Sequence, residues 1–121
     1  MSAPVWIGIG SVGGVGALLR FALDGCVSER LAGRFPWGTL AVNLSGAALL
    51  GLLAGLAVRG DALEIAGTGL LGAYTTFSTW MLESHQLGAD DSPLLLALNL
   101  AGSLALGIGA AALGRTIGGA L

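Results

Sequence analysis

The chain has few charged residues and almost no cysteine. Only 10% of its 121 residues are charged, with five arginines, no lysine and a net charge of −2, which excludes a basic nucleic-acid-binding surface. A single cysteine, Cys26, excludes a disulfide scaffold. Apolar side chains make up 55% of the chain and glycine occupies 22 positions. A water-exposed surface needs about 25% charged residues, so this composition indicates an integral membrane protein.

The charged residues divide the chain into four apolar segments, residues 3–23, 37–58, 65–82 and 93–113. Each is close to the ~20 residues that an α-helix needs to cross a ~30 Å hydrocarbon core. Because the segments are apolar around their whole circumference, buried helices of a soluble protein are the weaker interpretation. We therefore predict an all-α membrane protein, a single domain of residues 1–121 with four transmembrane helices.

The segments between the spans are short. We expect loops at residues 24–36, 59–64 and 83–92, and a helix that begins at Ser92-Pro93. None of these loops is large enough to fold into an enzyme domain, so we predict a non-enzymatic function inside the bilayer. The first span lacks the basic start and the cleavage site of a signal peptide, so we expect it to remain in the mature protein.

The arginines give little information on orientation. With four crossings, Arg59 and Arg115 lie on one side and Arg30 and Arg34 on the other, with Arg20 just inside the first span. The Lys and Arg bias normally sets orientation, so this near balance sets it weakly. Either a modest bias suffices for one orientation, or the chain inserts both ways and pairs with an inverted copy of itself, like an inverted repeat on two chains.

Glycines indicate close packing of helices, within one chain or between two. In lipid, small residues let helix backbones approach each other. The candidates by spacing or position are Gly10, Gly14, Gly51, Gly55, Gly102 and Gly107.

Polar residues inside the spans are the strongest functional signal. Arg20 either snorkels to the interface or attracts anions at a pore mouth. Asn43 either links helices by hydrogen bonds or lines a polar pathway. Asn99 and Ser103 are four residues apart, on one helix face, which suits a pathway or a plain interhelical hydrogen-bond cluster.

The third span combines glycine with Thr and Ser in a way that disfavours a regular helix. We expect it to unwind around residues 72–78. Unwound backbone at membrane depth is tolerated only where it is buried in protein or lines an aqueous cavity. Freed carbonyl groups there could coordinate a cation.

Four stretches together resemble the Fluc (CrcB) family of fluoride channels. They are GGVGALLRF at 13–21, PWGTLAVNLSG at 36–46, GAYTTFSTW at 72–80 followed by Glu83, and Asn99 followed by Gly102 and Ser103. The resemblance covers essentially the whole chain. It implies antiparallel, dual-topology homodimers of four-helix subunits with a broken third helix and two fluoride pores, in a prokaryotic plasma membrane.

The resemblance also implies roles for individual residues. Asn43 would donate to fluoride, and Phe77 would present its ring edge to the anion. Gly72 and Thr75 would offer backbone carbonyls to a structural Na⁺ at the dimer centre. Arg20 would shape an electropositive vestibule. The remaining pore and polar-track positions are Thr39, Ser78, Thr79, Trp80, Glu83 and Ser103.

Trp80 departs from the family pattern, because the second aromatic position of the motif is otherwise Phe. Trp keeps a positive ring edge and adds an N–H donor. This departure and the balanced arginines leave open a second interpretation, a non-conducting partner chain of a heterodimeric channel. A third is a proton-coupled exporter resembling small multidrug resistance proteins, which needs a carboxylate in the first span; here no acid precedes Asp24.

Overall fold

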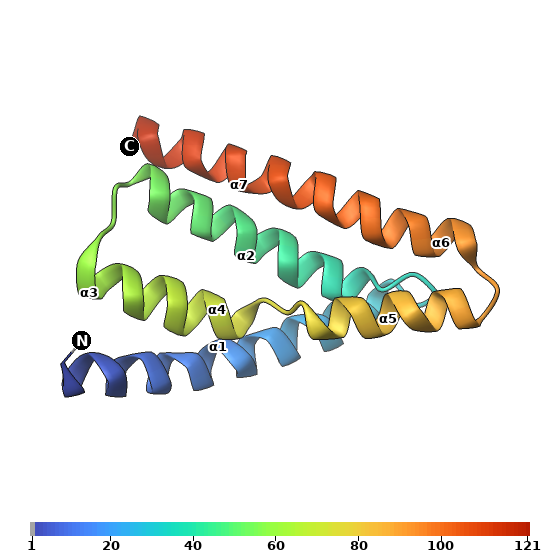
Figure 1. Ribbon diagram of the computed structural model, residues 1–121, viewed down its shortest axis with the longest axis horizontal. Coiled ribbons are helices and arrows are strands. Elements are labelled where there is room, and N and C mark those ends of the chain that lie inside the picture. The colour runs from blue at the N-terminus through green and yellow to red at the C-terminus, as the bar shows by residue number, and fades with distance from the viewer. Residues whose placement is uncertain (1) are drawn as a thin grey trace.

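The computed structural model describes residues 2–121, and these form helices joined by short connections, with no strand (Figure 1). The chain runs back and forth along the long axis of the molecule four times. The first two passes are single helices, α1 (Ala3–Arg30) and α2 (Trp37–Gly55). The third pass consists of α3 (Gly60–Leu63), η1 (Glu64–Leu71), α4 (Gly72–Tyr74) and α5 (Ser78–Ala89). The fourth pass consists of α6 (Pro93–Ala97), η2 (Leu98–Gly102) and α7 (Ser103–Ala120).

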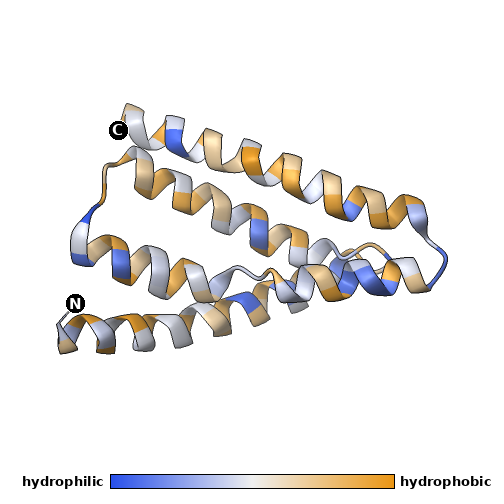
Figure 2. Cartoon of the chain, viewed as in Figure 1, coloured by the Kyte–Doolittle hydropathy of each residue, from blue (hydrophilic) through white to orange (hydrophobic). Residues whose placement is uncertain are grey.

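Three of these passes are continuous helices that are long and apolar enough to cross a bilayer: Ala3–Arg30, Trp37–Gly55 and Pro93–Ala120. The third pass is interrupted after Tyr74. Hydrophobic residues run along all four passes, whereas hydrophilic residues gather toward the two ends of the molecule (Figure 2). Both termini lie at the same end, beside α3, and α6 lies at the other end (Figure 1). The chain is a helical multi-pass membrane protein.

The helices extend further than the charges predicted. Residues 24–30 continue α1, residues 83–89 continue α5, and α3 begins at Gly60, so the predicted loops are wrong at these positions. A charged residue marks where a helix leaves the hydrocarbon, and the backbone hydrogen bonds of the helix continue into the interface beyond it. The predicted helix start at Pro93 is confirmed, with the proline in the first turn, where its missing N–H has no cost.

Helices α2 and α7 pack backbone against backbone through glycine. A Cβ on Gly51 would overlap the Ala111 carbonyl, and a Cβ on Gly55 would overlap that of Arg115. The prediction of close packing at this pair is therefore confirmed. A side chain of any size at these positions would force the two helices apart.

The glycines of α7 that meet α2 are not those that the sequence indicated. Gly114 lies against the Ala48 carbonyl and Gly118 against that of Leu52, whereas a Cβ on Gly102 or Gly107 would meet nothing within 4 Å. Gly102 and Gly107 therefore make no close helix contact within the described residues, and their packing between two chains stays a prediction.

On helix α1, too, the glycine that contacts a neighbouring helix is not one of those that the sequence indicated. Gly16 lies against the Leu70 carbonyl of η1, and Gly69 of η1 lies against the backbone of Ile9. A Cβ on Gly10 or Gly14 would meet nothing within 4 Å in the described part of the chain. Spacing alone does not define which face of a helix meets its neighbour, so the predicted Gly10/Gly14 contact is wrong within one chain.

Replacing Gly114 by Ala should destabilise the bundle. The added methyl would overlap the Ala48 carbonyl, and overpacking of this kind costs about 1–3 kcal/mol. The measurement is thermal unfolding of the purified protein in detergent. Gly109→Ala, on the same helix with nothing within 4 Å of the new methyl, is the matched control and should leave the transition unchanged or raised. Equal stability of the two variants would contradict the backbone contact.

Candidate functional site

The interruption of the third pass is short and has a defined geometry. The Thr75 amide and hydroxyl both donate to the Leu71 carbonyl, at 3.0 Å each, and so close the last turn of α4. The Thr75 backbone is extended, with φ −80° and ψ 162°. Helix α5 then begins at Ser78, and the Thr76 hydroxyl accepts a 3.2 Å hydrogen bond from the Thr79 amide. The predicted unwinding is right for residues 75–77 and wrong for residues 72–74 and for Ser78, which are helical.

Asn43 of α2 binds the backbone of this interruption from the side. Its Nδ2 donates to the Thr76 carbonyl and its Oδ1 accepts from the Thr76 amide, both at 2.9 Å. A backbone group at membrane depth needs such a partner, because lipid supplies none. Asn43 therefore links two helices, as one of its two interpretations predicted.

The same contact leaves a carbonyl without its usual partner. In a continuous helix the Thr76 amide would donate to the Gly72 carbonyl, but here it donates to Asn43. Beside it, the hydroxyl of Tyr74 shares a 2.8 Å hydrogen bond with Ser45 of α2, which fixes α4 against α2. The end of α4 is thus anchored to α2, while its Gly72 carbonyl lacks the amide of a continuous helix.

A groove of about 490 Å³ lies between α2, the interrupted pass and α7. Its walls are mostly apolar and its polar side chains are few. The lining residues are Asn43, Gly46, Ala47, Leu50, Gly67, Leu71, Gly72, Thr75, Thr76, Phe77, Trp80, Ser103, Leu104, Gly107, Ile108 and Ala111. Gly107, which does not contact α2, lies here on the groove wall.

Two aromatic rings stand on the groove wall next to the interruption. The rings of Phe77 and Trp80 meet edge to face, with centroids 5.7 Å apart and planes at 80°. Phe77 is 69% exposed. The Trp80 indole nitrogen Nε1 donates to the Asn99 carbonyl of η2 at 3.0 Å.

The structure brings together six of the residues singled out from the sequence. Asn43, Gly72, Thr75, Phe77, Trp80 and Ser103 all line the groove. Arg20 is half-buried on α1 and does not line it. Ser78 and Thr79 lie in the first turn of α5, outside the lining. Whether any of these residues contacts an ion stays a prediction.

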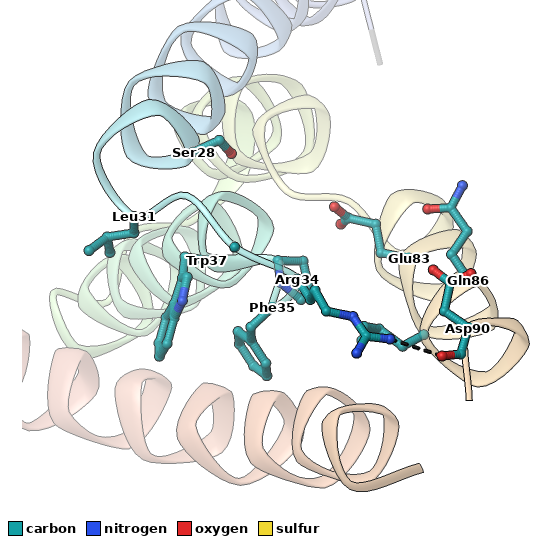
Figure 3. A pocket seen from close by; sticks show the side chains of 11 residues that line it. Ser28, Leu31, Arg34, Phe35, Trp37, Glu83, Gln86 and Asp90 are labelled. Carbon is teal, nitrogen blue, oxygen red and sulfur yellow. Dashed lines mark hydrogen bonds between the residues drawn. The ribbon is translucent and has the colours of Figure 1, made fainter. Parts of the chain in front are cut away.

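Thr39 and Glu83 lie together at another place. The buried Thr39 hydroxyl donates to the Glu83 carboxylate, which links α2 to α5. Glu83 also lines a separate polar pocket of about 230 Å³ between the end of α1, the 31–36 connection and α5 (Figure 3). In this pocket the Arg34 guanidinium donates to the Asp90 carbonyl at 2.9 Å and to the Ser92 hydroxyl.

Ser84, which was not predicted from the sequence, forms hydrogen bonds with Trp80 and Asn99. The Asn99 side chain, 1% exposed, donates from Nδ2 to the Ser84 hydroxyl at 2.8 Å, and Ser84 in turn donates to the Trp80 carbonyl at 2.7 Å. The predicted pair of Asn99 and Ser103 is hydrogen-bonded at 3.4 Å. The four-residue spacing of Trp80 and Ser84 was the signal in the sequence that could have identified Ser84.

The fold and the groove define a class: a helical multi-pass membrane protein whose third crossing is broken against a polar residue of the second. Residues 7–115 match the family described as CrcB-like protein, Camphor Resistance (CrcB), and the chain belongs to this family. The resemblance inferred from the four motifs is thereby confirmed.

Relatives from several bacteria match almost the full chain. A protein named fluoride-specific ion channel FluC 2 from Mycobacterium bovis is 53% identical over 117 residues, which cover 97% of this chain and 93% of that protein. One named FluC 1 from Symbiobacterium thermophilum is 44% identical, covering 93% and 96%. One named FluC from Nitrosococcus oceani is 40% identical, covering 93% and 92%. The chain is therefore similar along its length to proteins named as ion channels.

Asn43→Ala should release the backbone of the interruption. Loss of both hydrogen bonds leaves the Thr76 amide and carbonyl without their partner, and the amide should exchange with solvent deuterium about tenfold faster or more. The measurement is amide hydrogen exchange of the purified protein. Ser45→Ala, which removes a contact to the Tyr74 ring hydroxyl instead, should leave Thr76 exchange near that of the parent chain. Unchanged exchange in Asn43→Ala would contradict the assigned contact.

Proposed function

We propose that this protein is a fluoride-selective channel that lets fluoride leave the cytoplasm passively through a prokaryotic plasma membrane and so reduces fluoride toxicity. One observation carries the proposal: a groove at membrane depth combines an asparagine amide, a hydroxyl and exposed aromatic edges beside a broken helix. The names of the relatives point to the same ion.

Neutral donors suit a small and strongly hydrated anion. The Asn43 amide carries two hydrogens, of which the structure gives one acceptor, the Thr76 carbonyl. The Ser103 hydroxyl makes only a long contact of 3.4 Å to Asn99. The exposed Phe77 ring offers its positive edge. Such sites replace water around fluoride yet hold it weakly enough for release.

The remaining predicted residues belong to the approach and exit of the same path. The half-buried Arg20 supplies positive charge at the vestibule, where its Nε has no hydrogen-bond partner among the described residues. Ser78 and Thr79 add hydroxyls at the start of α5. The Thr39–Glu83 pair borders the polar pocket beyond α5.

A second copy of the chain, inserted upside down, closes the groove. In one chain the groove opens to the outside, and Phe77, 69% exposed, would face lipid without a partner. The balanced arginines permit both insertions. Two grooves in an antiparallel homodimer then give two pores along the interface.

The donors at the end of α4 fit a structural Na⁺ at the centre of such a dimer. The Gly72 carbonyl lacks the amide of a continuous helix, because Thr76 donates to Asn43. The extended Thr75 backbone turns its carbonyl away from the helix axis. Carbonyl oxygens are ligands of hard cations, so Gly72 and Thr75 of both copies would hold the ion, whose charge would neutralise these oxygens.

A heterodimer is the second candidate. Relatives are named both FluC 1 and FluC 2, and this chain has Trp80 at an aromatic position. The chain would then pair with a related chain and contribute one wall of each groove, conducting through one pore or none.

Purified protein in liposomes should release fluoride and retain chloride. Phe77→Leu keeps an apolar side chain of similar size and removes the ring edge, so fluoride flux should fall by about tenfold, equivalent to ~1.4 kcal/mol. Fluoride and chloride efflux from the liposomes is measured with ion-selective electrodes, after a potassium gradient across the liposome membrane is released. Phe21→Leu, at an exposed phenylalanine of α1 outside the groove lining, is the control and should conduct like the parent chain.

Equal passage of chloride and fluoride would refute the proposal for this chain. Flux that appears only when a related chain is added would favour the heterodimer. Liposomes prepared with N-methylglucamine in place of Na⁺ test the cation site, since flux that is unaffected after exhaustive Na⁺ removal would contradict it.

The single cysteine reports orientation directly. Cys26 is exposed near the end of α1, so antiparallel copies place their two thiols on opposite sides of the membrane. In intact cells, about half of the protein should react with a membrane-impermeant maleimide. Labelling of all copies or of none would mean one orientation and would contradict the antiparallel dimer. Cys26→Ser is the background control.

A further inference from the structure

Trp80 differs from a phenylalanine at the same place by one hydrogen-bond donor, and the structure uses that donor inside the protein. Its Nε1 donates to the Asn99 carbonyl at 3.0 Å, while its ring lines the groove and meets Phe77 edge to face. An indole has a single N–H. The ring of Trp80 therefore remains available to the groove, whereas its N–H is bonded inside the protein.

The acceptor is the backbone carbonyl of Asn99, and the Asn99 side chain anchors that stretch of backbone, so Asn99→Ala keeps the acceptor and removes its anchor. Asn99 is 1% exposed, and all its side-chain polar atoms have partners: Nδ2 donates to Ser84 and Oδ1 accepts from Ser103. Ser84 is also buried and donates back to the Trp80 carbonyl. The contacts form a closed loop from the Trp80 indole through Asn99 and Ser84 to the Trp80 backbone.

The local helix geometry agrees with a special role. Asn99 lies in η2 (Leu98–Gly102), a π-helical turn between α6 and α7. Such wide turns are frequent at functional sites. This turn stands opposite α5, where Trp80 and Ser84 lie one helical turn apart.

We propose that Asn99 is a positioning residue that fixes the Trp80 indole, so that the ring edge and not the N–H faces the ion path, and that Ser84 fixes Asn99. The assignment rests on the proposed channel function. Its consequence is specific: an additional N–H donor free to turn into the groove would strengthen anion binding, whereas a fixed ring adds only a weak site. Disruption of this loop of hydrogen bonds should slow the release of fluoride, and the effect should depend on the Trp80 indole.

The first test measures the Trp80 indole proton itself. Protein with ¹⁵N-labelled tryptophan in detergent gives three indole signals, assigned with Trp6→Phe, Trp37→Phe and Trp80→Phe. The Trp80 signal should exchange with deuterium more slowly than those of Trp6 and Trp37, which are 59% and 44% exposed. Ser84→Ala removes two hydrogen bonds, one from Asn99 and one to the Trp80 carbonyl, and should speed Trp80 exchange by about fivefold. Thr116→Ala, an exposed hydroxyl on α7, should leave it unchanged.

The second test is a double-mutant cycle on fluoride flux. Ser84→Ala and Asn99→Ala are each compared in the parent chain and in Trp80→Phe. If Ser84 and Asn99 act through Trp80, each substitution should lower fluoride flux by about fivefold in the parent chain and should have little effect in Trp80→Phe. Ser84→Ala keeps the test valid if Asn99→Ala does not fold.

Equal effects in both backgrounds would overturn the proposal, because a merely structural role of Asn99 does not depend on the indole. Rapid exchange of the Trp80 indole in the parent chain would overturn it as well. If the parent chain passes no fluoride either alone or together with a related chain, the channel function is wrong. The exchange measurement alone then decides whether Asn99 positions Trp80.

Discussion

The pair of hydrogen bonds between Asn43 and the Thr76 backbone is the constraint on which the rest of the structure depends. A broken helix inside a bilayer leaves amides and carbonyls that lipid cannot satisfy. One asparagine amide satisfies both groups of a single residue, because its oxygen and nitrogen match an N–H and a C=O side by side. The break can therefore exist at membrane depth, and with it the aromatic wall and a Gly72 carbonyl that lacks its helical amide.

Glycine packing elsewhere sets where Asn43 stands. Gly51, Gly55, Gly114 and Gly118 bring the backbones of α2 and α7 into direct contact along one face of α2. The same helix presents Asn43 to the interrupted pass, and Ser45 to Tyr74. A shift of α2 away from α7 would move Asn43 relative to Thr76, so the packing of apolar helices and the polar contact at the break are not independent. The groove lies between the three passes that the glycine packing and the Asn43–Thr76 contact hold in place.

The sequence predicted the crossings and the break because both follow from one-dimensional features, the length of apolar runs and a Gly-rich, Thr-rich segment. It predicted Gly51 and Gly55 but not Gly114 and Gly118, because the contacting face of a helix depends on its neighbour and not on its own spacing. It placed Asn43, Phe77 and Trp80 near one another by family resemblance. The four-residue spacing of Trp80 and Ser84 contains their local contact, whereas the contact of Ser84 with Asn99 needed the register between α5 and η2, which no local pattern contains.

The donors along the groove share a property that bears on how an anion could pass. Asn43 is bonded to Thr76, the Trp80 N–H is bonded to Asn99, and Ser103 makes a long contact to the same residue. The groups that remain to bind an anion are the second amide hydrogen of Asn43, the loosely held hydroxyl of Ser103 and the edges of the aromatic rings. Each is a weaker site for an anion than a cationic side chain. In the proposed channel, a pathway lined in this way would favour entry of a small anion and also its departure, since groups of the protein already engage several of the donors.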